Sequence, residues 1–169
     1  VTTIGEGAFQ ACDSLTSVII SEGVTTIGKN AFYHCAALTN IELPCSVTSI
    51  GTGVFEGCSS LTSVTMSEGL ESIGSYAFYE CKGLACIVSK ETTPPWCFKQ
   101  VFYNVDKSIP VYVPMASVEA YKNATGWSEF TNIIGKDFEG EETSVANVVA
   151  DELVVRLDGG TLVVEGVSD

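Results

Sequence analysis

Apolar and polar positions repeat at a fixed period over the first half of the chain. Four copies of equal length follow one another without a gap, at residues 1–23, 24–46, 47–69 and 70–92. Aligned copies place a single residue type in each of five columns: Ile4/Ile27/Ile50/Ile73, Gly5/Gly28/Gly51/Gly74, Phe9/Phe32/Phe55/Phe78, Cys12/Cys35/Cys58/Cys81 and Leu15/Leu38/Leu61/Leu84. A fixed period of this length predicts a solenoid of stacked coils, which presents a surface rather than enclosing an active site.

Each copy contains two strand patterns. The run Leu-x-x-Val-x-Ile, as at residues 15–20, predicts a strand whose Val and final Ile face the core, because side chains alternate along a strand. The other strand positions then face outward on a parallel sheet: Ser17, Ile19, Asn40, Glu42, Ser63, Thr65, Cys86 and Val88. The run Val-Thr-Thr-Ile-Gly predicts a second, shorter strand, and we expect its glycine to supply a turn conformation closed to other residues.

The segment Ala-Phe-x-x-Cys-x-x-Leu has helix-like spacing and predicts a helical turn that packs the Phe column into the core. We interpret the stacked phenylalanines as core rather than as a ligand box. The column cysteines are interpreted as buried free thiols that act as small hydrophobes. Cys45, Cys86 and Cys97 lie outside the column, and a bridge among them is left open.

The period breaks after residue 92, and residues 93–135 have the features of a C-terminal cap. Residues 109–114 predict a strand bounded by prolines, which suits a sheet edge. Ser117 is placed as the N-cap of a helix that runs to about Asn123. Three apolar residues then fold back over the last coil: Trp127, Phe130 and Ile133.

The remaining residues divide into an acidic linker at 136–150 and a β-hairpin within 151–169, signalled by two apolar runs around Asp158-Gly159-Gly160. Because a lone hairpin is marginal in water, it either docks on the cap or opens a further β domain, and we favour the second. Val1 is in register with the repeat. We therefore expect a leader, with or without further repeats, upstream of it.

The chain is strongly acidic, with 21 acidic and 8 basic residues and a net charge of −13. This balance argues against binding to nucleic-acid phosphates or anionic lipids, and it is compatible with basic partner patches, with bound cations or with solubility alone. No apolar run reaches the roughly 20 residues that span a membrane, so no membrane insertion is expected. Glu22, Glu68 and Glu91 recur after the strand; one carboxylate per coil is too few for calcium, and we interpret them as an exposed acidic edge.

The repeat Val-Thr-x-Ile-Gly-x-x-Ala-Phe-x-x-Cys-x-x-Leu-Thr-x-Val-x-Ile, as at 24–43, resembles the bacterial leucine-rich repeat class typified by the surface antigen BspA. Residues 112–130 resemble the terminal segment that follows such repeats in Bacteroides-type surface proteins. The resemblance implies a right-handed leucine-rich-repeat solenoid, with short parallel strands stacked into a sheet, helical or 3-10 turns on the other side, and a C-terminal α+β cap. The asparagine ladder of ordinary leucine-rich repeats is missing.

For function, the resemblance implies a protein at the extracellular or outer-membrane surface that adheres to a host extracellular-matrix or cell-surface protein, or to another bacterial surface component. The candidate contact face for a protein or glycan partner is the outward strand face: Ser17, Ile19, Asn40, Glu42, Ser63, Thr65 and Val88. The alternative is a structural spacer. No nucleophile–base pair, phosphate loop or CxxC is present, and the single histidine, His34, lies in a variable position, so no catalytic, cofactor or metal site is expected.

Overall fold

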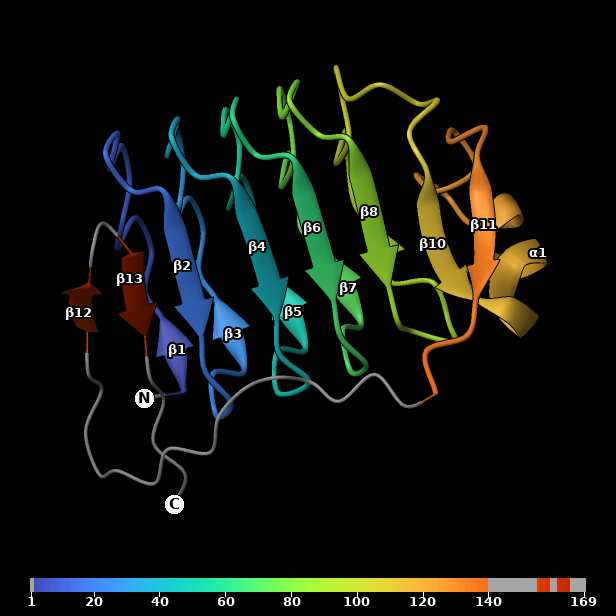
Figure 1. Ribbon diagram of the computed structural model, residues 1–169, viewed down its shortest axis with the longest axis horizontal. Coiled ribbons are helices and arrows are strands. Elements are labelled where there is room, and N and C mark those ends of the chain that lie inside the picture. Colours follow the sequence, from blue (N-terminus) through green and yellow to red (C-terminus); the bar gives the residue numbers. More distant parts are fainter. Residues whose placement is uncertain (1, 140–154, 159–160, 165–169) are drawn as a thin grey trace.

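The computed structural model describes residues 2–139, 155–158 and 161–164, and it shows a solenoid built from two layers of parallel strands (Figure 1). The longer strands lie side by side on one face, which we call the main sheet. Strand pairing joins five of them: β4 (Asn40–Leu43), β6 (Ser63–Met66), β8 (Cys86–Ser89), β10 (Val111–Pro114) and β11 (Ile133–Lys136). The sixth, β2 (Ser17–Ile20), lies beside β4 but is not paired with it as a strand. The short-strand sheet lies beside the main sheet: β1 (Thr3–Ile4), β3 (Thr26–Ile27), β5 (Ser49–Ile50), β7 (Ser72–Ile73) and β9 (Trp96–Cys97).

Both strand predictions are confirmed. Along β4, Ile41 and Leu43 are buried, while Asn40 and Glu42 are exposed on the opposite face. Neighbouring strands pair at an offset of one repeat, so that Asn40 lies beside Ser63 and each coil repeats the contacts of the one before. The core therefore lies between the two sheets as a continuous row of apolar side chains.

The segment between the short and long strands forms the expected short turns, with 3-10-type bonds three residues back, but not a continuous helix. In the second coil the N–H groups of residues 31, 33 and 35 bond three residues back within the coil, whereas those of residues 30, 32 and 34 bond to the next coil. Asn30 and His34 have φ of 57° and 56°, in the left-handed region. A helix needs every N–H to point along its own axis, so this alternation produces a series of separate turns instead.

The column glycines also have a different role from the one expected. None of Gly5, Gly28, Gly51 and Gly74 is among the residues with positive φ. A Cβ on Gly74 would lie 2.4 Å from the backbone carbon of Gly51, whereas a Cβ on Gly5, in the first coil, would meet nothing within 4 Å. The column is glycine because the backbones of successive coils approach closely there, not because the turn is left-handed.

The interpretation of the Phe and Cys columns as core is confirmed. Phe32 and Phe55 are fully buried, and their rings stack with centroids 5.5 Å apart. All seven cysteines are free. The buried thiols also bond between coils, since Sγ of Cys58 donates to the carbonyl oxygen of Phe32 at 3.2 Å and Sγ of Cys81 donates to that of Phe55 at 3.0 Å.

Threonine hydroxyls form a further ladder between coils that the sequence reading missed. Oγ1 of Thr39 donates to the carbonyl oxygen of Thr16 at 3.1 Å, and Oγ1 of Thr62 donates to that of Thr39 at 2.9 Å. Thr25 and Thr48 form the same kind of link beside the short-strand sheet. These hydroxyls make coil-to-coil bonds of the kind that an asparagine ladder would make.

The expected boundary at residue 92 does not end the solenoid. Strand β9 pairs with β7, placing Cys97 beside Ile73, and Phe102 continues the ring stack 5.6 Å from Phe78. The offset in this coil is longer by one position than the repeat, as the pairing of Val111 with Ile87 shows. One inserted residue and the loss of consensus residues therefore hide a fifth coil from a search at fixed period.

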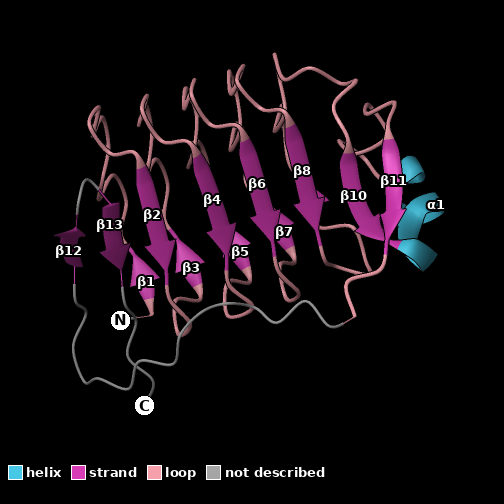
Figure 2. Cartoon of the chain, viewed as in Figure 1, coloured by secondary structure: helices cyan, strands magenta, loops and turns pink. Residues whose placement is uncertain are grey.

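The C-terminal end is closed by strand β11 and a short helical segment, η1 (Met115–Ser117) and α1 (Val118–Asn123), which lies beside β11 (Figure 2). Ser117 precedes α1 as expected, but its hydroxyl makes no cap bond; it is buried and donates to the carbonyl oxygen of Thr92 at 2.8 Å. The strand at residues 109–114 is not the edge, because β11 pairs on its outer side.

Two aromatic residues of the cap fill the end of the core. Trp127 is fully buried and tilts against Phe102 at 5.2 Å, and its indole N–H donates to the carbonyl oxygen of Pro95 at 2.9 Å. Tyr121 is also fully buried, and its hydroxyl donates to the carbonyl oxygen of Glu91 at 3.0 Å. These contacts join the cap to the fourth and fifth coils.

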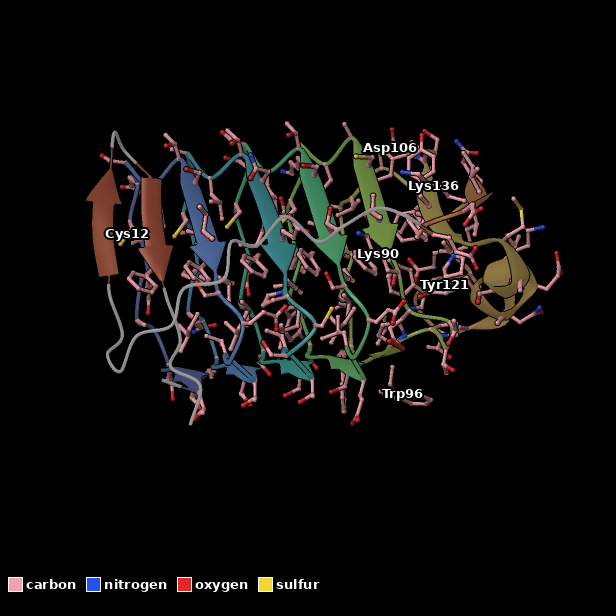
Figure 3. The ribbon with its side chains drawn as sticks, turned by 60° about the horizontal axis from the view of Figure 1, so that its bottom comes forward. Cys12, Lys90, Trp96, Asp106, Tyr121 and Lys136 are labelled. Carbon is pink, nitrogen blue, oxygen red and sulfur yellow. The ribbon has the colours of Figure 1, made fainter. Side chains whose placement is uncertain are left out.

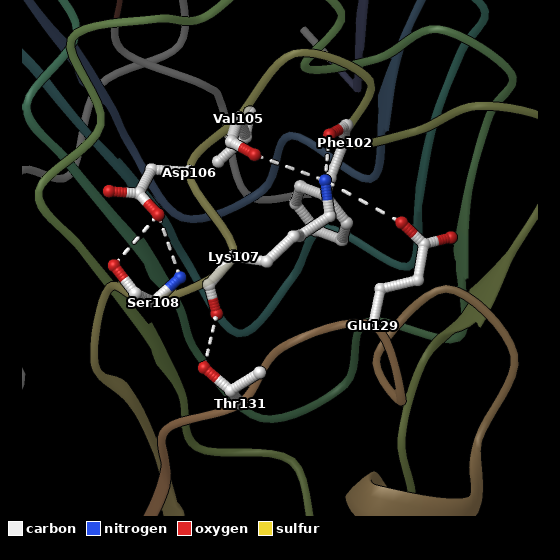
Figure 4. Close-up of polar contacts among 7 residues, drawn as sticks. All are labelled: Phe102, Val105, Asp106, Lys107, Ser108, Glu129 and Thr131. Carbon is white, nitrogen blue, oxygen red and sulfur yellow. Dashed lines mark hydrogen bonds and ion pairs between the residues drawn. The ribbon is translucent and has the colours of Figure 1, made fainter.

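Lys107 holds the loop of the fifth coil to the cap (Figure 4). Its ammonium donates to the carbonyl oxygens of Phe102 and Val105 at 2.6 and 3.1 Å and lies 3.5 Å from the Glu129 carboxylate. Because three acceptors surround it and its side chain is only 25% exposed, this lysine is a structural cation rather than a free surface charge.

The predicted hairpin is present as the antiparallel pair β12 (Val155–Asp158) and β13 (Thr161–Val164). It does not lie on the C-terminal cap: β13 pairs in parallel with β2, at the opposite end of the main sheet (Figure 1). Most of the expected acidic linker, from residue 140, lies outside the described residues, and Lys136 belongs to β11. None of the helices in the described part of the chain has the length and apolar character that crossing a membrane requires.

The glycine column yields a first prediction. Gly74→Ala forces a Cβ into the backbone of the preceding coil, and we expect the free energy of unfolding to fall by about 1–3 kcal/mol in urea denaturation. Gly5→Ala is the matched control, because its Cβ meets nothing. That change should leave stability unaltered or raise it by up to about 1 kcal/mol, since alanine restricts the unfolded chain. Equal effects at the two positions would contradict the close-approach explanation.

The buried thiols yield a second prediction, on alkaline stability. Burial raises the pKa of Cys58 from its ordinary value of 9.0 to about 12, and that of Cys35 to about 11. The unfolded chain therefore ionises these thiols before the folded one does. Their stabilisation is complete below pH 9 and is lost as the pH rises from 9 toward 12, at roughly 1.4 kcal/mol per pH unit for each thiol.

Urea unfolding at pH values from 8 to 11 measures this loss. Cys58→Ala should make the fall in unfolding free energy less steep by roughly 1.4 kcal/mol per pH unit above pH 9. The control Val54→Ala removes buried volume from the same coil without removing a thiol. It should lower stability equally at every pH, and a slope unchanged by Cys58→Ala would refute the assignment.

Candidate protein-interaction surface

The outward face of the main sheet carries the residues expected to contact a partner. Asn40 and Glu42 on β4 are exposed, Ser63 and Thr65 on β6 are half-buried, and Ile19 on β2 is 48% exposed. Ser17 and Val88 are half-buried on the same face, and Cys86 lies beside Ser63. The structure therefore brings all the residues predicted from the strand alternation onto one surface.

This surface extends further than the sequence reading placed it. Tyr112 on β10 pairs with Val88 on β8, and Ile134 on β11 pairs with Tyr112. Tyr112 is half-buried and Ile134 is 37% exposed. The sequence signal for Tyr112 was the alternation of Val111, Tyr112 and Val113, which predicts that Tyr112 faces outward. Tyr112 follows Val88 by one residue more than the repeat length, so a search at the fixed period misses it.

One residue from each strand of the main sheet forms a line across this face, which we call the outer row: Ile19, Glu42, Thr65, Val88, Tyr112 and Ile134. At about 4.8 Å per strand the row is roughly 24 Å long. Its only charge is the Glu42 carboxylate, and aliphatic side chains stand at both ends. The row thus has a polar centre between aliphatic ends, with Ile19 and Ile134 both exposed.

The acidic edge has a structural role as well. The Glu22 carboxylate accepts hydrogen bonds from the backbone N–H groups of Cys45 and Ser46 at 3.2 and 3.1 Å, and Glu91 accepts one from Gly69 at 2.5 Å. These glutamates therefore bond turns of successive coils to each other. Among the described residues, no group of three or more His, Cys, Asp or Glu side chains is placed to hold a metal ion.

The side chain of His34 lies in a surface depression of about 370 Å³ formed by the turns of the second to fourth coils. Its ring occupies the space above Gly57, where a Cβ would come within 2.8 Å of it. Burial raises the pKa of Glu56, while hydrogen bonds from Lys82 and Asn104 lower the pKa of Glu80. Within the described part of the chain, no hydrogen bond joins His34 to Ser59 or Glu56, which line the same depression.

A second depression, of about 490 Å³, lies at the ends of the strands beside the cap. The ammonium groups of Lys90 and Lys136 stand 5.8 and 5.3 Å from the ring centroid of Phe138, and Glu68 and Asp137 line the same space. Charges of both signs are interleaved there. The depression therefore favours neither an anion nor a cation.

Trp96 is the most exposed aromatic residue of the short-strand sheet, at 62%, and it projects away from the body of the solenoid (Figure 3). It lies on β9, the last strand of that sheet, on the opposite side of the molecule from the outer row. Phe98, two residues further along the chain, is exposed as well, at 56%. Scattered exposed apolar side chains are ordinary on a protein surface.

Two solved structures resemble this chain, and the first of them supports the fold. A leucine-rich repeat protein of T. pallidum is 25% identical with a TM-score of 0.59; the match covers 79% of this chain and 62% of that one. A leucine-rich cell surface protein of Faecalibacterium prausnitzii A2-165 is 20% identical with a TM-score of 0.35, covering 81% of this chain and 52% of that one. The chain thus spans less than two thirds of the T. pallidum protein. No curated protein matches it.

The repeats themselves decide the family. Residues 1–108 match the model described as "BspA type Leucine rich repeat region (6 copies)", a span that includes the fifth coil found in the structure. Such repeats indicate a protein-interaction module, and their families are typically non-enzymatic. This chain belongs to the BspA-type leucine-rich repeat family.

Proposed function

We propose that this protein is a non-enzymatic adhesion module that uses the outward face of its main sheet to bind a protein at a cell surface. The observation that carries the proposal is the contrast between constant core columns and a varied outer face. The core positions keep one residue type through successive coils, whereas the outer row changes from Ile19 through Glu42 and Thr65 to Val88 and Tyr112. The BspA-type repeats support a location at the cell surface as part of this proposal.

The geometry of this face favours binding because its residues are already ordered. Strands β4, β6 and β8 are bonded to one another along the sheet, and the side chains that project outward from them are mostly short or β-branched. A rigid surface loses little conformational entropy on association. The row extends this ordered surface over roughly 24 Å.

The Glu42 carboxylate, the only charge of the outer row, indicates the sign of charge that a partner surface would carry. It is exposed and forms no ion pair with the described residues, and the chain as a whole carries a net charge of −13. A basic patch on a host extracellular-matrix or cell-surface protein complements this charge, and so does a basic patch on another bacterial surface component.

The competing function is a spacer that holds another domain away from the cell surface. The bonding between coils would serve this role equally well, because it stiffens the stack along its length. A spacer needs no particular outer residues, however. Substitution at the outer row therefore distinguishes the two functions.

Glu42→Arg is predicted to weaken binding to immobilised extracellular-matrix proteins at least tenfold, which is about 1.4 kcal/mol, because it reverses the only charge on the outer row. Surface plasmon resonance with the purified chain measures the dissociation constant. Asn40→Ala, on the same strand, should also weaken binding, to a smaller extent.

The matched control is Glu71→Arg, which makes the same change of charge on an exposed residue beside the short-strand sheet. It should leave the affinity unchanged. Equal weakening by Glu42→Arg and Glu71→Arg would show non-specific attraction instead of a defined face. Absence of binding to every matrix and cell-surface protein tried would favour the spacer.

A further inference from the structure

Tyrosine side chains gather on the turn segments of the fourth and fifth coils, outside the core. The rings of Tyr79 and Tyr103 stack in parallel with centroids 4.8 Å apart, and the ring of Tyr76 packs edge-on against Tyr79 at 5.6 Å. Tyr103 is 44% exposed, and the other two are half-buried. All three belong to the segments between the short and long strands, so the proposed contact face on the main sheet does not account for them.

Tyr76 is held in a backbone conformation that bulky residues rarely adopt. Its φ is 61°, in the left-handed region. The equivalent positions of the other coils share this conformation and hold smaller or more polar residues: Gly7, Asn30, Gly53 and Gln100. Core packing does not explain the strain, because the Tyr76 ring lies outside the core. Unexplained strain of this kind is typical of functional sites.

Tyr79 is part of the wall of the depression of about 370 Å³ that the turns of the second to fourth coils form. Tyr103, from the fifth coil, stacks on this ring and does not line the depression, so it supports the ring from behind. The ring of His34 also lines the depression, and the ring of Tyr33 packs against it at 4.4 Å. Two aromatic rings, each supported by another, therefore line a space of the size that small-ligand sites have.

The polar groups around this depression are held in place. The Glu80 carboxylate accepts a hydrogen bond from the side-chain amide of Asn104 and lies 2.6 Å from the Lys82 ammonium. The half-buried Glu56 and the exposed Ser59 line the same space. Groups that are positioned before a ligand arrives lose little conformational entropy when it binds.

The lining selects an uncharged ligand that carries many hydroxyl groups. The Lys82 ammonium disfavours a cation, and the carboxylates of Glu56 and Glu80 disfavour an anion. Carboxylates accept hydrogen bonds, an ammonium donates them, and the Ser59 hydroxyl does both. Sugar hydroxyls can pair with each of these groups, while the C–H face of a pyranose ring packs on an aromatic ring. A carbohydrate therefore matches both the polar and the aromatic part of the lining.

The depression beside the cap also has charges of both signs, but its aromatic ring is already in contact with cations. There the ammonium groups of Lys136 and Lys90 lie 5.3 and 5.8 Å from the ring centroid of Phe138. Among the described residues, none of the cation–π contacts involves Tyr79 or His34. The Tyr79 ring is therefore available for stacking, whereas the Phe138 ring is not.

We propose that the depression lined by Tyr79 is a carbohydrate site, in which a neutral glycan stacks a pyranose ring on Tyr79 and bonds through its hydroxyls to Glu56, Glu80 and Lys82. The site shares no residue with the outer row. The chain can therefore contact a glycan on its turn segments independently of any protein bound to the main sheet.

NMR titration of the full 169-residue chain with cellotetraose and with chitotetraose, at constant pH, tests this proposal. Both probes have equatorial ring hydroxyls, which leave C–H groups on the faces of each ring. His34 is the only histidine of the chain, so its imidazole signals report on the depression without ambiguity. We expect at least one probe at millimolar concentration to shift these signals in a saturable way. The absence of a shift with both probes would overturn the proposal.

Tyr79→Ala removes the stacking ring and should weaken binding of that probe at least about tenfold. Tyr79→Phe keeps the ring and should retain most of the affinity. Glu56→Gln leaves all the rings in place and should also weaken binding, because the charged hydrogen-bond acceptor is lost.

Tyr112→Ala is the matched control, because it removes a tyrosine from the outer row instead of from the depression. It should leave the affinity for the probe unchanged. Equal weakening by Tyr79→Ala and Tyr112→Ala would overturn the site, as would Tyr79→Phe that binds as poorly as Tyr79→Ala. Tighter binding of arginine amide than of either sugar would identify a cation site instead.

Discussion

The distance between successive coils, about 4.8 Å along the sheet, is the constraint on which the rest of the structure depends. Phenylalanine rings fit this distance by stacking with their centroids 5.2–5.6 Å apart. A glycine occupies each column position where the two backbones come closer than a Cβ allows. Thiol and threonine hydroxyl groups are short enough to reach the carbonyl oxygen of the preceding coil. The residue type in each of these columns is thus one that fits the same distance between coils.

These contacts between coils use the backbone and inward side chains. The outward side chains of the strands therefore take no part in holding the coils together. A change from Glu42 to Thr65 to Val88 along the outer row alters no contact that holds the coils together. The stack can therefore present different chemistry on each coil at little cost in stability. The separation between a constant core and a free face makes this fold suitable for recognition, and it also explains why family membership alone does not name a ligand.

The sequence predicted the features that depend on local alternation and missed those that arise only on stacking. Burial of Ile41 and Leu43 followed from a period of two. The role of Gly74 did not, because its close neighbour, Gly51, lies a full repeat earlier in the chain. The spacing of Phe32 and Cys35 suits a helix, but it also suits successive turns in which alternate N–H groups bond to the next coil. The outward face was found, yet Tyr112 was missed because one inserted residue shifts the period.

The contacts at the two ends of the described stack span very different separations in the sequence, and these separations affect how each contact forms. In an open solenoid each coil contacts only its neighbours, so the terminal coils are the least stable. Here Trp127 and Tyr121 close one end with residues that follow directly in the chain. At the other end β13 bonds to β2, although almost the whole solenoid separates these two strands in the sequence. Contacts of such long sequence separation cost more loop-closure entropy, although this cost rises only slowly with length. The pairing of β13 with β2 therefore closes a much longer loop than the contacts of Trp127 and Tyr121 do, and by this measure it is expected to form later in folding.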